Sequence, residues 1–203
     1  MITVEKRLFK NYSIYTFGRI LGVLSSLVLL PLFTKKIPQE EFGIVGLLWL
    51  VQPILIRLIN LGVDVSVSLK FFKLKHDELS NYLFNALFVI FSLTMGIWLL
   101  FHFNIHWVQW VLDKSMTSLL FNLLYLSIVS SMLRTMMLSF MQLSGKAWQN
   151  VLFTVFPPII VTAITYYLII FVEPSYTSYI TGLSIGNGIF GIVAIFYFFR
   201  KYS

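Results

Sequence analysis

Three arginines, Arg19, Arg57 and Arg134, interrupt long apolar stretches of the chain. Each has polar or small residues three or four positions away, a spacing that places side chains on one face of a helix. An arginine in an apolar membrane environment costs about 2.5–3.5 kcal/mol on insertion scales and typically faces a polar pathway. Because guanidinium groups bind phosphate oxygens in pairs, these positions predict a site for an anionic, phosphate-like ligand.

The neighbours on these three faces suggest the composition of the site. They are Tyr15, Gly22 and Ser26 beside Arg19; Pro53, Asn60 and Asp64 beside Arg57; and Ser127, Ser130 and Ser131 beside Arg134. Three arginines and one carboxylate leave a surplus of two positive charges, which favours an anion in a low-dielectric cavity. The candidate substrate-binding residues are therefore Arg19, Arg57, Arg134, Asn60 and Asp64.

The elements that carry these residues are predicted to be membrane-spanning helices. Of the 203 residues, 58% are hydrophobic and 11% are charged, and the mean hydropathy is +0.86. A soluble domain has about 25% charged residues, and a bilayer-spanning helix needs roughly 20 apolar ones. We expect an all-α integral membrane protein, one domain over 1–203, with six helices at about 11–33, 40–63, 81–103, 118–141, 149–171 and 178–199.

The distribution of lysine and arginine predicts the orientation of this bundle. With the N-terminus inside, the cytoplasmic segments hold nine of the 15 basic residues, the outer loops hold three and the spans hold the three arginines. Cytoplasmic loops carry the excess of basic residues in membrane proteins. We therefore expect both termini in the cytoplasm and the protein in the inner (cytoplasmic) membrane, as a multi-pass protein in contact with membrane lipids.

In that orientation the three arginines lie at one depth. Arg19 is eight residues from the inner start of its span, and Arg57 and Arg134 are six and seven residues from the inner ends of theirs. A rise of 1.5 Å per residue places all three about 10–12 Å from the cytoplasmic boundary. The competing interpretation is that each arginine extends to the lipid head groups without binding a ligand.

Other functional classes find little support in the sequence. There is no cysteine, no H-E-x-x-H or G-x-S-x-G motif and no P-loop lysine, so we expect neither an enzyme nor a metal or cofactor site. The basic residues are scattered between apolar runs, which argues against nucleic acid. Apart from Glu40 and Glu41 at the start of the second span and Asp64 at the border of its end, the spans contain no Asp or Glu, which argues against a cation-coupled exporter of the conventional kind.

Two further patterns concern packing. Gly182 and Gly186 stand four residues apart in the sixth span, a spacing that permits close helix contact. The segment 68–79 mixes aromatic and basic residues, and we expect it either to lie along the inner leaflet or to form a short charged loop.

The segment 31–43, with the sequence PLFTKKIPQEEFG, resembles the first-loop signature of bacterial polysaccharide flippases of the Wzx type. These belong to the multidrug/oligosaccharidyl-lipid/polysaccharide superfamily. Asn11, Tyr12 and Arg19 resemble the first helix of this superfamily. The end of its second helix is matched by residues 61–63 together with 71–72, and its fourth helix and the following loop are matched by residues 134–146. The likeness extends over the whole chain, with the first-loop motif the most specific part.

The resemblance implies one lobe of a two-lobed flippase, which moves undecaprenyl-pyrophosphate-linked oligosaccharide across the cytoplasmic membrane for O-antigen, lipopolysaccharide or capsule synthesis. It implies that cationic residues of the N-terminal lobe, here Arg19, Arg57 and Arg134, hold the anionic substrate. Six helices are half of the family's usual number, so we expect a fragment, a homodimer or a separate second lobe. The alternatives are a non-transporting scaffold of a polysaccharide assembly complex, an exporter of small amphiphiles and, more remotely, an enzyme of lipid-linked sugars.

Overall fold

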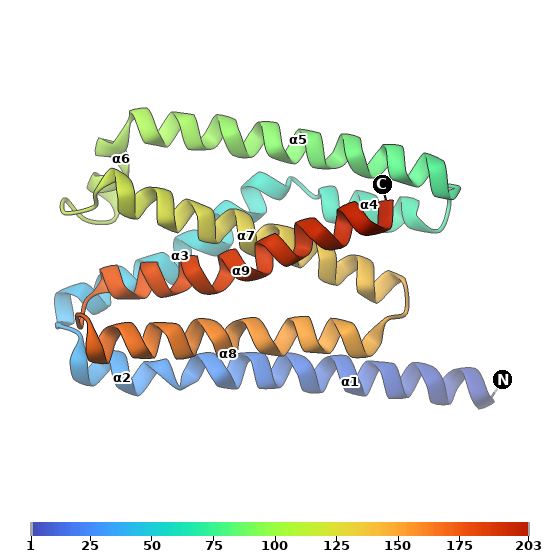
Figure 1. Ribbon diagram of the computed structural model, residues 1–203, viewed down its shortest axis with the longest axis horizontal. Coiled ribbons are helices and arrows are strands. Elements are labelled where there is room, and N and C mark those ends of the chain that lie inside the picture. The colour runs from blue at the N-terminus through green and yellow to red at the C-terminus, as the bar shows by residue number, and fades with distance from the viewer. Residues whose placement is uncertain (1, 203) are drawn as a thin grey trace.

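The computed structural model describes the backbone of residues 2–202 and the side chains of residues 12–18, 20–24, 27–75, 77–198 and 200. Every regular element within these residues is a helix (Figure 1). The helices are α1 (Ile2–Leu27), α2 (Leu29–Lys36), α3 (Gln39–Asn60), α4 (Val63–Phe71), α5 (His76–Phe103), α6 (Ile105–Val111), α7 (Ser118–Leu143), α8 (Ala147–Phe171) and α9 (Tyr176–Tyr202).

Six segments of the described chain are long and apolar enough to cross a membrane. They are Tyr12–Lys36, Gln39–Asn60, Asp77–Phe103, Ser118–Leu143, Ala147–Phe171 and Tyr176–Phe198. Each coincides with one of the six spans expected from the apolar runs, and the prediction of an all-helical, multi-pass membrane protein is confirmed at that level. The first of these spans is formed by α1 and α2 together.

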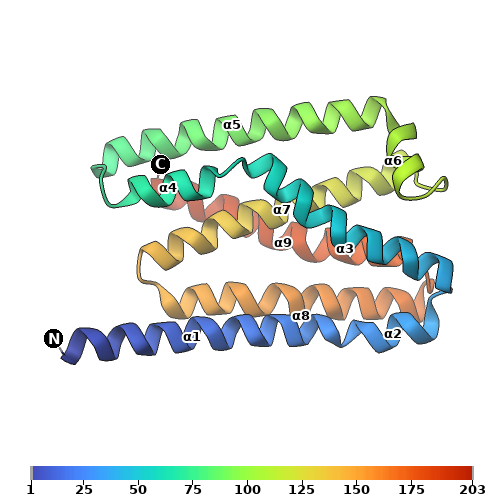
Figure 2. The same cartoon turned by 180° about the vertical axis from the view of Figure 1, so that it is seen from behind.

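The bundle is built around α7 and α9. In an 18-residue stretch of each of their spans 56% of the residues are buried, against 17% in the corresponding stretch of α3. The most extensive helix contacts are α7 with α9, α1 with α8, and α8 with α9. Figures 1 and 2 show α5 along one edge of the bundle and α1 along the opposite edge, with α7 and α9 between them. We call the end where α1 begins and α9 ends the terminal end, and the opposite end the far end.

Glycines allow α9 to approach its neighbours closely. A Cβ atom at Gly182 would lie 2.8 Å from the Cα of Thr165, and one at Gly186 would lie 2.9 Å from the Cα of Val161, both on α8. A Cβ at Gly191 would lie 2.7 Å from the Cβ of Ser130 on α7. The expected close packing at the Gly182 and Gly186 pair is thus confirmed, with α8 as its partner.

The second span ends earlier than its apolar run predicts. We expected a helix to residue 63, but Leu61 and Gly62 have positive φ values of 43° and 76°, which end α3 at Asn60. The chain then starts again as α4, so Asp64 lies in the first turn of α4 and not on the face of the second span as predicted. The segment 68–79 is divided among the end of α4, a four-residue connection and the start of α5.

Prolines lie inside two of the long helices. Pro53 lies within α3, and Pro157 and Pro158 lie within α8, and both helices continue on either side of these residues. Each proline lacks the N–H group of a helical hydrogen bond, so both helices are locally weaker there. Pro53 and Pro158 also line the cavity described next.

Candidate functional site

A cavity of about 680 Å³ is lined by six helices, α1, α2, α3, α7, α8 and α9. Its walls are mainly apolar, with polar groups contributed chiefly by α3 and α7. The polar and aromatic lining residues are Trp49, Gln52, Arg57, Asn60, Ser131, Arg134, Thr135, Thr162, Tyr179 and Asn187. Two of the three predicted arginines and the predicted asparagine therefore face one cavity.

Arg57 lies at the open edge of this cavity. Its side chain is 80% exposed, and its Nη1 atom lies 3.9 Å from Oδ2 of Asp64, whose side chain is 15% exposed. The break at Leu61 and Gly62 brings Asp64 to this position, and Asp64 also accepts a hydrogen bond from the backbone N–H of Val65. A long ion pair with an exposed partner contributes about 0–1 kcal/mol, so Arg57 remains available to a ligand.

Arg134 lies inside the cavity on the central helix α7. Its Nε atom is buried and has no hydrogen-bond partner, and no carboxylate forms a salt bridge with it within the described residues. An arginine in a spanning helix normally pairs with a counter-charge or with backbone carbonyls. The positive charge of Arg134 is therefore uncompensated by the described protein groups, which favours an anion in the cavity.

Asn60 is the third predicted residue in the cavity wall. It is the last residue of α3 and is 4% exposed, and its buried Oδ1 atom has no hydrogen-bond partner among the described residues. Leaving a buried polar atom without a partner costs about 1–3 kcal/mol. Asn60 thus provides a further polar group that a ligand or a water molecule can satisfy.

The other predicted residues lie differently. Asp64 contacts the cavity only through Arg57. Arg19 is part of α1, but its side chain lies outside the described residues. On the same helix, the predicted polar face is partly closed, because a Cβ at Gly22 would lie 3.3 Å from the backbone oxygen of Thr154 on α8. Val23 and Leu27 line the cavity from α1 instead.

Sequence reasoning missed two amides in the wall of the same cavity, Gln52 and Asn187, which share one hydroxyl partner. Asn187 on α9 donates a hydrogen bond from Nδ2 to Oγ of Ser127 on α7 (2.9 Å), and Gln52 on α3 donates from Nε2 to the same oxygen (3.4 Å). The signal was present, because Gln52 lies in the middle of an apolar run. It was overlooked because uncharged amides also connect helices in membranes without binding any ligand.

Aromatic side chains line the part of the cavity that lies toward the far end. Trp49 donates from Nε1 to the hydroxyl of Tyr179 (2.6 Å), and Phe33 packs edge-on against Tyr179 at 5.4 Å between ring centroids. Beyond this cluster, Glu41 accepts a hydrogen bond from the backbone N–H of Tyr176 (2.9 Å). These contacts join α2, α3 and α9 at the far end.

Asp113, in the connection between α6 and α7, extends this set of contacts. The pKa of its carboxyl group is lowered, chiefly by the hydrogen bond from the hydroxyl of Ser115 and further by Tyr176. The charged carboxylate therefore helps to hold this connection against the start of α9.

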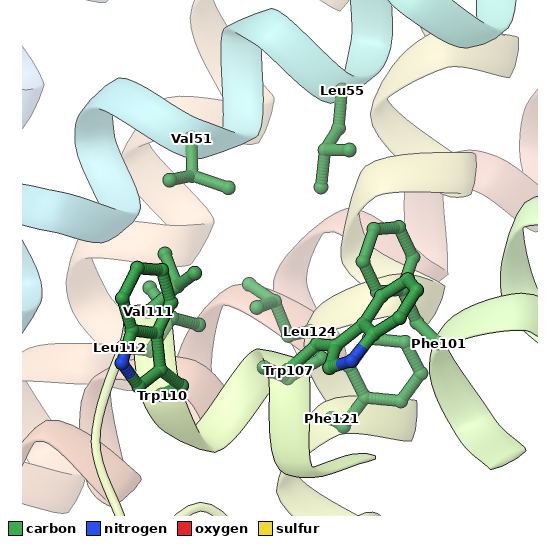
Figure 3. A pocket seen from close by; sticks show the side chains of 10 residues that line it. Val51, Leu55, Phe101, Trp107, Trp110, Val111, Leu112, Phe121 and Leu124 are labelled. Atoms are coloured by element: carbon green, nitrogen blue, oxygen red, sulfur yellow. The ribbon is translucent and has the colours of Figure 1, made fainter. Parts of the chain in front are cut away.

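A second pocket, of about 500 Å³, lies near the far end between α3, α5, α6 and α7. Figure 3 shows Val51 and Leu55 of α3 on one side and Trp107 and Trp110 of α6 on the other. All ten lining residues are apolar or aromatic. Arg57, Arg134, Asn60 and Asp64 do not line it, and its described lining offers no charge to an anion.

Comparisons with protein-family models, with curated proteins and with solved structures found no match to this chain. The candidate site therefore rests on the geometry of the cavity, and the roles of Arg19, Arg57, Arg134, Asn60 and Asp64 stay predictions.

Proposed function

We propose that this protein forms a lobe of a membrane transporter that moves an undecaprenyl-pyrophosphate-linked saccharide across the bilayer. One observation carries the proposal: Arg57 and Arg134, from two spanning helices, line one cavity in which Asp64 can neutralise only Arg57. The remaining charge suits a pyrophosphate, whose oxygens accept paired hydrogen bonds from guanidinium groups. The resemblance of the first loop to polysaccharide flippases supports the same substrate class.

The two arginines have different tasks in this mechanism. Arg57 is exposed at the cavity edge and meets the pyrophosphate first, with little cost for leaving Asp64. Arg134 is further inside and gains a partner for its buried Nε atom. The saccharide enters the cavity with the phosphates, while the isoprenoid tail stays in the bilayer hydrocarbon.

The orientation follows from the distribution of basic residues. With nine basic residues on the side of the termini and three on the other, the terminal end faces the cytoplasm. Lipid-linked saccharides assembled in the cytoplasm then reach Arg57 from the inner leaflet of the cytoplasmic membrane. The aromatic cluster at Trp49 and Tyr179 lies toward the outer side in this orientation, and its hydrogen bond supports an inward-facing arrangement of the cavity.

The opposite wall of the transport pathway would come from a second lobe, as in the family that the chain resembles, or from a second copy of the chain. Transport by alternating access requires the two lobes to rock about the bound substrate, so that the aromatic cluster separates. The hydrogen bond between Trp49 and Tyr179 is then one of the contacts that must break when the cavity opens outward.

The test is an export assay in a cell whose surface glycan depends on this protein. The double variant Arg57→Ala/Arg134→Ala should reach the membrane in normal amounts but abolish glycan export. The matched control is Lys114→Ala with Lys146→Ala, which removes two exposed basic residues that do not line the cavity. Normal export in the arginine variant would refute the proposal. If that variant exports normally but loses a binding partner, the protein is a scaffold instead.

A further inference from the structure

Anion binding by the arginines does not involve the residues that line the outer part of the cavity. Trp49, Gln52 and Asn187 line the cavity, come from α3 and α9, and carry no charge. They form a second group of polar side chains, which we call the amide–indole cluster. A pyrophosphate has no need for these residues, because the arginines already provide the charged donors.

Positions along two helices independently place the amide–indole cluster nearer the far end than the arginines. On α3, Gln52 precedes Arg57 by five residues, which corresponds to about 8 Å along the helix. On α7, Ser127, which binds both amides, precedes Arg134 by seven residues, or about 10 Å. A group attached directly to a phosphate held by the arginines can therefore reach the level of the amides.

The cluster retains hydrogen-bonding capacity. Both amide N–H groups that contact protein converge on one oxygen, Oγ of Ser127. Within the described residues no donor contacts the side-chain oxygen of Gln52 or of Asn187, although Asn187 is only 6% exposed. Each amide also has a second N–H, so the cluster presents both donors and acceptors to the cavity.

An aromatic ring of fixed orientation completes the cluster. The hydrogen bond from Trp49 to Tyr179 and the packing of Phe33 and Phe42 against the indole hold its ring in place. Trp49 nevertheless remains 40% exposed and lines the cavity. A flat apolar surface beside amide groups matches a sugar ring, which has an apolar C–H face and a rim of hydroxyl groups.

We propose that Trp49, Gln52 and Asn187 form a saccharide subsite, which holds the sugar next to the pyrophosphate by stacking on the indole and by hydrogen bonds to the amides. This inference rests on the proposed function, because it takes the arginines as the phosphate subsite. It adds a prediction that the anion site alone does not make: the protein distinguishes a sugar-bearing lipid pyrophosphate from the bare one.

The competing explanation is that the amides only connect α3, α7 and α9. Hydrogen bonds between membrane helices contribute to stability, and their loss would then change unfolding alone. The two explanations differ in ligand selectivity, which a purely structural contact does not affect.

The experiment compares the binding of two probes to the purified full chain in detergent by native mass spectrometry. The probes are undecaprenyl pyrophosphate and the same lipid carrying one N-acetylglucosamine or one glucose. The variants are Gln52→Met, which nearly keeps the side-chain volume, and Trp49→Leu. The matched controls are Gln149→Met and Trp148→Leu, which change exposed residues of α8 that do not line the cavity. Arg57→Ala reports on the phosphate subsite.

We expect the wild-type protein to bind a sugar-bearing probe more tightly than the bare pyrophosphate. Gln52→Met and Trp49→Leu should each reduce this preference about three- to tenfold, the effect of one neutral hydrogen bond or one aromatic contact, with bare pyrophosphate binding unchanged. Arg57→Ala should weaken both probes equally, and the α8 controls should change neither.

The outcomes separate the two proposals. If the wild-type protein binds both probes equally, or if both cavity variants keep the wild-type preference, the saccharide subsite is refuted while the phosphate subsite stands. If the wild-type protein binds neither probe, the proposed function fails and the subsite fails with it.

Discussion

Replacing Arg134 by methionine is expected to make the protein more stable and to remove its affinity for a pyrophosphate. Arg134 lies in a spanning helix, and its buried Nε atom has no partner. Methionine keeps an unbranched apolar side chain but removes the guanidinium group. A residue kept at a cost in stability is expected where function requires it.

The size of the effect follows from the environment of Arg134. An unsatisfied buried donor costs about 1–3 kcal/mol, and the insertion scales give about 2.5–3.5 kcal/mol as an upper bound for the charge. We therefore expect Arg134→Met to stabilise the protein by about 1–3 kcal/mol. For a chain of this length that corresponds to a rise of about 2–12 °C in Tm.

The assay is thermal unfolding of the purified protein in detergent, followed by tryptophan fluorescence. Arg57→Met is the matched control, because the Arg57 side chain is 80% exposed and has an ion partner at 3.9 Å, so its loss should change stability by less than about 1 kcal/mol. Undecaprenyl pyrophosphate at 100 times its Kd should stabilise the wild-type protein by about 2.7 kcal/mol and should leave Arg134→Met unchanged. A variant less stable than wild type would refute the reasoning, since it would mean that the arginine has a compensating partner.

Three further predictions concern the scaffold around the site, and thermal unfolding of the purified protein measures each. Gly182→Ala should destabilise the protein by about 1–3 kcal/mol, because the new Cβ would lie 2.8 Å from the Cα of Thr165, whereas Gly188→Ala, with open space around it, should be neutral or slightly stabilising; equal effects would contradict the close packing of α8 and α9. Gly62→Ala should cost about 1–2 kcal/mol, because φ is 76° there, and an unchanged Tm would mean that the break after α3 is not fixed in this form. The pKa of Asp113 is lower in the folded protein, so its charged form stabilises the fold above the unfolded pKa of about 4, and this contribution is lost as the pH falls toward the folded pKa. The Asp113→Asn variant should therefore lose less stability than the wild-type protein on acidification. Identical pH profiles of the two proteins would argue against the contact with Ser115.

The spans could be predicted because a run of about 20 apolar residues has few alternatives to a spanning helix. The short helices α4 and α6, which lie outside the spans, could not be predicted this way, because helices of seven to nine residues are stabilised mainly by their neighbours. The end of α3 was missed for a related reason. Gly62 indicated a turn, but the positive φ of Leu61 is unfavourable for that residue type and depends on the packing around it.

The residues that line the site could be predicted where they are charged or strongly polar. Small residues on the same helix faces were a poorer guide to the site. Arg57, Arg134 and Asn60 face the cavity, because a strongly polar group in a spanning helix is costly against lipid. Gly22 and Ser130 were placed on the same polar faces, yet Gly22 meets α8 and Ser130 meets Gly191 of α9. Small residues allow helices to approach each other, so a face of small residues indicates a helix contact as readily as a cavity.

Because Arg57 has an ion partner and Arg134 has none among the described residues, an anion is expected to bind more strongly at Arg134 than at Arg57. A phosphate that binds Arg57 replaces Asp64, so the gain from the first contact is partly offset by the loss of the existing ion pair. A phosphate that reaches Arg134 replaces nothing and satisfies a buried donor, so the second contact is the stronger one. Under the proposed function, an anionic head group is therefore drawn from the exposed edge toward the interior, and the group attached to its phosphate can reach the level of Gln52 and Asn187. This order of affinities would let the proposed transporter fill the cavity before the aromatic contacts at Trp49 and Tyr179 open.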